Sequence, residues 1–85
     1  MKKLSNIHPG EILMNEFLNP LNISNIELSA RTSIPQIIID EIINEKRSIT
    51  IEIAMSLANY FNNSSEFWIG LQKDYDKEND FKNKS

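Results

Sequence analysis

The stretch that decides the fold is SNIELSARTSIPQIIIDEIINEKR, residues 24–47. Ser24 stands three residues before Glu27, which is the spacing of a capping box at the start of a helix. Residues 33–35 predict a turn, because Pro35 fits the start of a second helix and cannot extend the first one. The stretch therefore predicts two short helices joined by a tight turn.

The second of these segments, residues 36–44, is rich in isoleucine and is also compatible with a buried β-strand. We predict a helix, because the apolar residues recur at i, i+3 and i+4, a proline opens the run, and the flanking segments offer no partner strand. The inward side chains should be Ile39, Ile42 and Ile43. The outward ones should be Gln36, Ile37 and Asp40, and Ile38 is a further candidate for the outward side that the spacing alone leaves open. The two helices together have helix-turn-helix proportions, which many small helical domains share.

Three more helices complete the predicted domain. Pro9 suits the start of a helix that Pro20 should end. Thr50 should cap a fourth helix, and either Ser64 or Ser65 should cap a fifth.

We therefore predict an all-α, five-helix fold in a single domain. The expected parts are a flexible N-terminus over residues 1–7, a helix-turn-helix domain over residues 8–75 with a C-terminal dimerisation helix, and a charged, disordered tail over residues 76–85.

The composition limits the possible functions. The 85 residues allow one small domain, which buries about 60% of the surface that its unfolded chain exposes, and there are no cysteines for disulfides. The formal net charge of −3 argues against a polyanion binder held by charge alone, but it suits a sequence-reading domain or a basic protein partner. No apolar run is long enough to cross a membrane and no signal peptide is found, so we expect a cytoplasmic protein without membrane contact.

Catalysis has no support in the sequence. His8 is the only histidine, and its place before a proline at a helix start suggests a cap or a surface residue. No carboxylate is paired with a base or nucleophile, and neither a glycine-rich phosphate loop nor a metal-ligand spacing occurs. We therefore expect a non-enzymatic protein without catalytic residues, metal, cofactor or small-molecule ligand.

An apolar cluster at helical spacing marks the last helix and consists of Phe67, Trp68, Leu71 and Tyr75. Packing in the core explains part of each side chain. Because a domain of this size cannot enclose all four, we predict that this helix completes its burial against a second copy of the chain.

Five stretches spread over nearly the whole chain carry a family resemblance. They are HPGEILMNEFLNPLNIS (8–24), IELSARTSIP (26–35), IINEKRSIT (42–50), IAMSLANYF (53–61) and SSEFWIGLQKDYD (64–76). In them the chain resembles the HigA-type (VapI-like) antitoxins of the lambda-repressor-like helix-turn-helix group. The resemblance implies a homodimer that represses its own operon by binding operator DNA at an inverted repeat. It also implies a basic toxin partner, usually an mRNA-cutting ribonuclease of the HigB/RelE kind.

The resemblance further implies roles for single residues. The residues implied to read bases are Gln36, Ile37 and Asp40. Those implied to contact the DNA backbone are Asn25, Lys46, Arg47 and Ser48. Chemically, the Gln36 amide suits adenine, Ile37 suits a thymine methyl group, and Asp40 can accept from a cytosine amino group.

The chain departs from the family pattern on the same surface. Ile37 and Ile38 stand where relatives often have polar residues, and Ser33 and Glu45 replace turn glycines. A non-glycine residue at Glu45 carries a backbone penalty if its φ is positive. Two alternatives therefore stay open, namely a stand-alone helix-turn-helix regulator and a protein-binding module that has lost operator binding.

Overall fold

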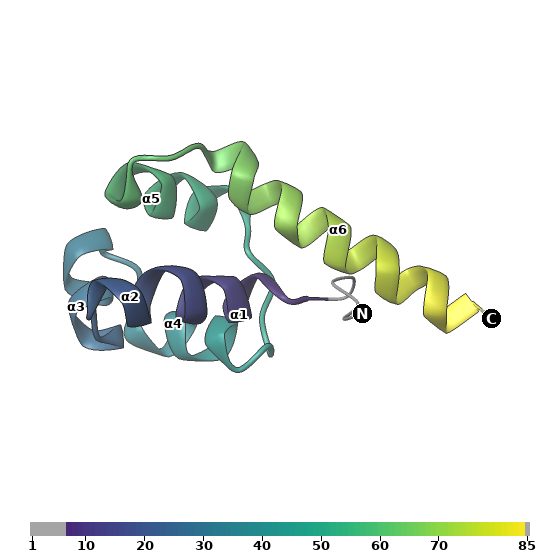
Figure 1. The fold of residues 1–85 in the computed structure, drawn as a ribbon, viewed down its shortest axis with the longest axis horizontal. Coiled ribbons are helices and arrows are strands. Elements are labelled where there is room, and N and C mark those ends of the chain that lie inside the picture. The colour runs from purple at the N-terminus through teal and green to yellow at the C-terminus, as the bar shows by residue number, and fades with distance from the viewer. Residues whose placement is uncertain (1–6, 85) are drawn as a thin grey trace.

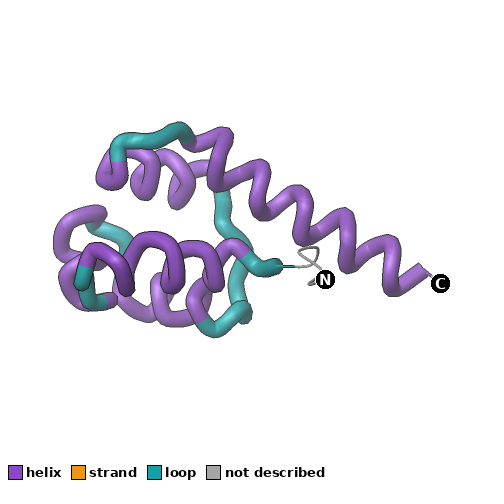
Figure 2. The backbone as a smooth tube through the Cα atoms, in the orientation of Figure 1, coloured by secondary structure: helices purple, strands orange, loops and turns teal. Residues whose placement is uncertain are grey.

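The protein, seen in a computed structural model, is described for the backbone of residues 7–84 and the side chains of residues 7–79. It is built from helices joined by short turns (Figure 1, Figure 2). The first helical segment has three consecutive parts: α1 (Pro9–Ile12), the π-helix η1 (Leu13–Leu18) and α2 (Asn19–Leu21). The later helices are α3 (Asn25–Thr32), α4 (Gln36–Ile43), α5 (Ile51–Phe61) and α6 (Ser65–Lys84). With the first segment taken as one helix, the described part of the chain has five helices, and the predicted all-α fold is confirmed.

The first helical segment begins at a cap made by a histidine. His8 Nδ1 accepts a hydrogen bond of 2.9 Å from the Gly10 N–H, and Pro9 follows at the first helical position, where an N–H would have no helical partner. The segment continues through Pro20 to Leu21. It ends there because Asn22 adopts the left-handed conformation, with φ of 58°. The prediction that Pro20 ends this helix is therefore wrong, since the helix passes through Pro20 and stops at Asn22.

The helices enclose one core. Figure 1 shows the first helical segment alongside α4, with α3 at one end, and α5 packs on α3 and α6. The largest fully buried side chains are Trp68, Leu13, Leu18, Leu28, Ile39, Ile42 and Leu57. A tight contact joins α1 to α4 at Gly10, where an added Cβ would lie 1.9 Å from the Ile42 carbonyl oxygen. A side chain at Gly10 would therefore force these two helices apart.

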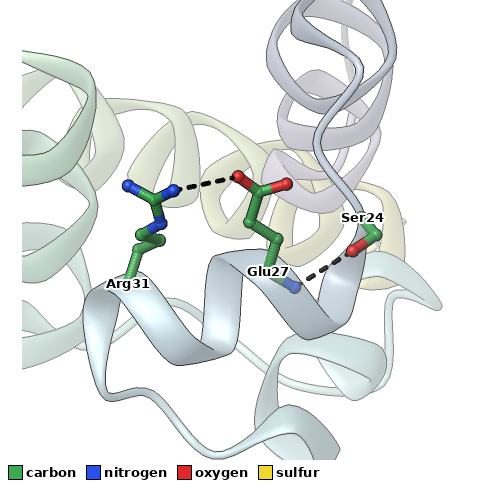
Figure 3. Close-up of polar contacts among 3 residues, drawn as sticks. All are labelled: Ser24, Glu27 and Arg31. Carbon is green, nitrogen blue, oxygen red and sulfur yellow. Dashed lines mark hydrogen bonds and ion pairs between the residues drawn. The ribbon is translucent and has the colours of Figure 1, made fainter.

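The start of α3 is capped as predicted. The Ser24 Oγ accepts a hydrogen bond of 3.0 Å from the Glu27 N–H (Figure 3). Only this half of the predicted capping box is formed, because the Glu27 carboxylate points along the helix and pairs with Arg31 at 3.5 Å. One serine hydroxyl therefore fixes where the helix-turn-helix begins.

A hydrogen bond from a side chain of α3 stabilises the turn between α3 and α4. Ser33 ends α3 in the left-handed conformation, with φ of 66°. The Ser29 Oγ donates a hydrogen bond of 2.6 Å to the Ile34 carbonyl, which closes the turn. Pro35 stands at the N-cap of α4, and residues 36–43 are helical. The choice of helix over strand for the isoleucine run is confirmed.

The ends of α5 and α6 also follow local signals. The Thr50 Oγ1 accepts from the Ile53 N–H at 3.3 Å, which confirms the predicted cap of α5. Asn62, with φ of 60°, ends that helix. Of the two serines considered for the last cap, it is Ser64 whose Oγ accepts from the Phe67 N–H, at 3.1 Å.

The last helix is longer than expected. Figure 1 shows α6 projecting beyond the other helices, and its backbone stays helical to Lys84. The helical backbone of residues 76–84 differs from the disordered tail that we expected from residue 76. Extending a helix whose first turns are already packed costs less than starting one, and polar residues such as glutamate and lysine favour helix. No helix within residues 7–84 has both the length and the apolar character needed to cross a bilayer. The flexible N-terminus expected over residues 1–7 lies, apart from Ile7, outside the described residues.

Candidate nucleic-acid interface

The outward side of α4 is the candidate surface for reading DNA. Gln36 and Ile37 are exposed, and Ile37 leaves 65% of its surface accessible. Ile39 and Ile42 are each only 1% exposed, on the opposite side of the helix. The structure therefore has Ile39 and Ile42 inward and Gln36 and Ile37 outward, as predicted, whereas Asp40 is only partly exposed.

Ile38, whose side the sequence left open, does not share the exposure of Ile37. It is half-buried, packs against the core, and lines a cleft of about 310 Å³ between the helix-turn-helix corner and α5. Ile53 of α5 lines the same cleft. Of the two isoleucines, only Ile37 is thus free to meet a thymine methyl group.

Two residues predicted as separate DNA contacts bind each other. Asn25 Nδ2 donates a hydrogen bond of 2.8 Å to Asp40 Oδ1, and the pair is partly buried. Asn25 opens α3 and Asp40 lies within α4, so the bond crosses the helix-turn-helix corner. Because this carboxylate already has a donor, Asp40 is less available to a cytosine amino group than the sequence suggested.

The loop after α4 has a defined geometry. The Lys46 N–H donates to the Glu41 carbonyl at 2.7 Å and the Glu45 N–H donates to the Ile42 carbonyl at 3.0 Å, which together form a Schellman motif. Glu45 takes the left-handed position of this motif, with φ of 64°, where glycine is usual. The backbone penalty anticipated for Glu45 is therefore present. The Lys46 side chain is exposed.

The Arg47 side chain also makes a contact within the protein. Its Nε donates to the Glu41 Oε1 at 2.6 Å, with the two side chains 43% and 37% exposed. Exposed ion pairs contribute little to folding stability. This pair does hold the guanidinium against α4, beside the exposed residues Lys46 and Ser48. The three predicted backbone contacts of the loop thus remain together.

Gln72 is a residue that the sequence reasoning missed. It is only 5% exposed, and its Oε1 accepts from the Ile49 N–H at 2.8 Å while its Nε2 donates to Asp76 Oδ1 at 3.0 Å. The first bond ties the loop between α4 and α5 to α6, and the second, within α6, orients the Gln72 amide. The signal was available, because Gln72 and Asp76 both belong to the LQ-x-x-YD part of the family motif.

His8 joins the first helical segment to α6. Its ring is 3% exposed and meets the Tyr75 ring edge-on, with centroids 4.8 Å apart. Burial lowers the pKa of His8 below its ordinary value of 6.5, against the opposing influence of the Glu45 and Asp76 carboxylates. The neutral ring is the form whose Nδ1 accepts from Gly10. The cap role expected for His8 is therefore confirmed, and the surface role is wrong.

The residues predicted to form the dimer differ in accessibility. Trp68 is fully buried, and its Nε1 donates to Asn63 Oδ1 at 3.0 Å, so it has no surface left for a second copy. This corrects the prediction for Trp68, which instead fills the protomer core. Leu71 and Tyr75 are half-buried. Phe67, at 40% exposed, is the member of the cluster that remains most accessible.

Comparisons find relatives over most of the chain. The helix-turn-helix family HTH_3 matches residues 14–69. Virulence-associated protein I of Dichelobacter nodosus is 39% identical over 70 residues, which cover 82% of this chain and 65% of that protein. The chain therefore spans just under two thirds of the length of this relative.

Solved structures of similar fold are also found. Antitoxin HigA of Pseudomonas aeruginosa, determined with the higBA promoter, matches with a TM-score of 0.87 and 36% identity, over 89% of this chain and 83% of that one. An addiction module antidote protein of the HigA family from Coxiella burnetii matches with a TM-score of 0.88 and 38% identity, over 94% of this chain and 87% of that one.

Proposed function

The chain belongs to the helix-turn-helix family HTH_3, and we propose that it is a HigA-like antitoxin. The resemblance to HigA-type antitoxins is confirmed by its solved neighbours. In this proposal a dimer binds an inverted repeat in its operator and represses its own operon. The same protein neutralises a basic, mRNA-cutting ribonuclease toxin in the cytoplasm.

The DNA-binding part of the proposal rests on the surface made by α4 and the loop after it. Gln36 and Ile37 face solvent from the first turn of α4, and the Schellman motif fixes the loop that bears Lys46 and Arg47. A solvent-facing helix flanked by positive side chains fits the major groove, where Gln36 pairs with adenine and Ile37 meets a thymine methyl group. Lys46, Arg47 and Ser48 contact the phosphates and set the register.

Two copies are needed to read an inverted repeat, since each α4 occupies one half-site and the half-sites lie ~34 Å apart. We propose that the dimer forms through the paired helices α5 and α6. Of the large exposed apolar side chains, this pair carries Ile51, Met55 and Phe67, which are 61%, 58% and 40% exposed. Leu71 and Tyr75 border this surface in the proposal, whereas Trp68 supports it from the core.

The DNA-binding proposal is tested by a gel-shift titration. The purified protein is incubated with the DNA immediately upstream of its own gene and, separately, with a random fragment of equal length. We expect retardation of the upstream fragment at moderate salt and weaker, salt-sensitive retardation of the random one. Equal affinity for the two fragments would contradict sequence-specific binding.

The toxin proposal needs a separate experiment. The neighbouring open reading frame is expressed from an inducible promoter, with and without this protein. Growth arrest by the neighbour alone, relieved by co-expression, is the expected outcome. A neighbour that is harmless on its own would remove the antitoxin role and leave a stand-alone helix-turn-helix regulator.

A protein-binding module is the second candidate, and the exposure of Ile37 favours it. An isoleucine that leaves 65% of its surface in solvent suits an apolar partner surface as well as a thymine methyl group. Such a module would form a complex with the neighbouring gene product but would not discriminate the upstream fragment from random DNA. The two experiments together therefore separate the candidates.

A further inference from the structure

The recognition surface carries two adjacent carboxylates, Asp40 and Glu41, in a protein whose net charge is already −3. Carboxylates beside DNA repel phosphates, so an unpaired Asp40 or Glu41 would lower the affinity of the surface. The sequence had suggested that Asp40 reads a base, and it assigned nothing to Glu41. The structure points to a different use for both side chains.

Each carboxylate is bonded to a side chain that comes from a neighbouring segment. Asp40 Oδ1 accepts from Asn25 Nδ2 at 2.8 Å, across the helix-turn-helix corner. Glu41 Oε1 accepts from Arg47 Nε at 2.6 Å, across the loop that follows α4. Asn25 and Arg47 are two of the residues that the family resemblance assigns to the DNA backbone. The two carboxylates therefore hold two candidate phosphate contacts.

The bonding leaves donors available on both held side chains. An asparagine amide has two N–H donors, and within the described residues Nδ2 of Asn25 makes one hydrogen bond, to Asp40. An arginine has five N–H donors, and the Glu41 contact uses the one on Nε. The terminal nitrogens of Arg47 can therefore still meet a phosphate while its stem stays in place. Fixing a flexible side chain before binding reduces the entropy lost on complex formation.

We propose that Asp40 and Glu41 are positioning residues that set Asn25 and Arg47 for contact with DNA phosphates, and that Asp40 is not a base reader. This inference rests on the proposed DNA-binding function. It predicts that removing either carboxylate weakens DNA binding, whereas simple charge repulsion predicts that the same change tightens it. Removal of a merely repulsive carboxylate tightens DNA binding, whereas removal of a positioning carboxylate weakens it.

The test measures dissociation constants for the upstream DNA fragment with wild-type protein and the variants Asp40→Ala, Asn25→Ala and the double variant. We expect each single variant to weaken binding about tenfold and the double variant to be no weaker than either, because both changes remove one unit. Asp40→Asn retains an acceptor oxygen and should stay close to wild type. Glu16→Ala, which removes an exposed carboxylate outside α4, should leave binding unchanged or slightly tighter.

A second pair of variants tests the loop. Glu41→Ala should weaken binding although it removes a negative charge, and Arg47→Ala should also lower the slope of log K against log salt by about one. The Glu41→Ala effect should vanish in an Arg47→Ala background. Thermal melts of the free proteins check that each variant folds.

The outcomes are distinguishable. Tighter or unchanged binding by Asp40→Ala or Glu41→Ala overturns the inference while leaving the proposed function intact. A change of preference at one base pair in Asp40→Ala, rather than a uniform loss over all operator variants, makes Asp40 a base reader and also overturns it. Wild-type protein that fails to discriminate the upstream fragment overturns the proposed function and, with it, this inference.

Discussion

Gln36 is the side chain that we expect to carry most of the sequence preference. It is exposed at the first position of α4, and a glutamine amide can both donate to and accept from adenine in the major groove. Gln36→Ala should cost about 1–3 kcal/mol of binding free energy on the native operator and relax the preference at one base pair. Titration of operator variants that differ by one base pair measures this.

The control for Gln36 is Asn15→Ala, which truncates an exposed amide on the first helical segment, outside α4 and the proposed dimer surface. It should bind every operator variant as the wild type does. A uniform loss over all base pairs in Gln36→Ala, with no single position relaxed, would assign Gln36 to the DNA backbone instead.

His8 gives the fold a dependence on pH. Because burial lowers its pKa in the folded state below the ordinary value of 6.5, the unfolded chain binds a proton more readily than the folded one. The stability that neutral His8 contributes is therefore complete above about pH 6.5 and is lost as the pH falls through the lower, folded-state pKa. Protonation also removes the Nδ1 acceptor that caps α1.

Urea unfolding at fixed protein concentration, between about pH 7.5 and about pH 5, measures this effect. The free energy of unfolding of wild-type protein should fall on acidification. His8→Asn keeps a side chain that can cap a helix but cannot titrate, so its fall should be smaller. The same pH dependence in both proteins would mean that His8 is not the group responsible.

The contact of α1 with α4 leaves no room for a single added carbon atom at Gly10. A Cβ at Gly10 would lie 1.9 Å from the Ile42 carbonyl oxygen, whereas a Cβ at Gly70 would meet nothing within 4 Å. Gly10→Ala should destabilise the fold by about 2–3 kcal/mol or more through overpacking. Gly70→Ala should stabilise α6 by about 0.5–1 kcal/mol, since alanine loses less backbone entropy in a helix.

Thermal denaturation of the two glycine variants makes a matched comparison, because the same methyl group is added to a helix in both. The melting temperature should fall for Gly10→Ala and stay level or rise for Gly70→Ala. Similar shifts for both would contradict the tight packing of α1 on α4.

The starts of the helices could be predicted because each depends on residues that are neighbours in sequence. The caps at Ser24 and Thr50 need only a hydroxyl and the next turn of helix. The isoleucine run could be assigned to a helix because its inward residues repeat at helical spacing. The strained Glu45 could be anticipated because the family pattern has a glycine at that place.

Contacts between helices could not be predicted, since they depend on how the elements pack. Asn25 meets Asp40 from 15 residues away, and the Ile49 N–H meets Gln72 from 23 residues away. Helical spacing placed Trp68 in the apolar cluster of the last helix but did not say whether its own chain or a second copy covers it. In the structure its own chain covers Trp68, and Phe67 is the most exposed residue of the cluster.

For the molecule as a whole, we predict a dimer that depends on α5 and α6. Met55→Ser and Phe67→Ser remove exposed apolar surface from this pair, and each should raise the dimer dissociation constant about tenfold. Leu21→Ser is the control, because Leu21 is 57% exposed but belongs to the first helical segment. Sedimentation velocity over a range of concentrations reports the effect, and a loss as large in Leu21→Ser would place the dimer surface elsewhere.

The most direct test of the central claim is a footprint of the protein on the DNA upstream of its own gene. The proposed dimer places one α4 in each of two successive major grooves. It should therefore protect two half-sites related by inversion, with centres ~34 Å apart, and insertion of half a helical turn between them should abolish binding. Protection no stronger than on random DNA, or of a single unrepeated half-site, would contradict operator binding by a dimer.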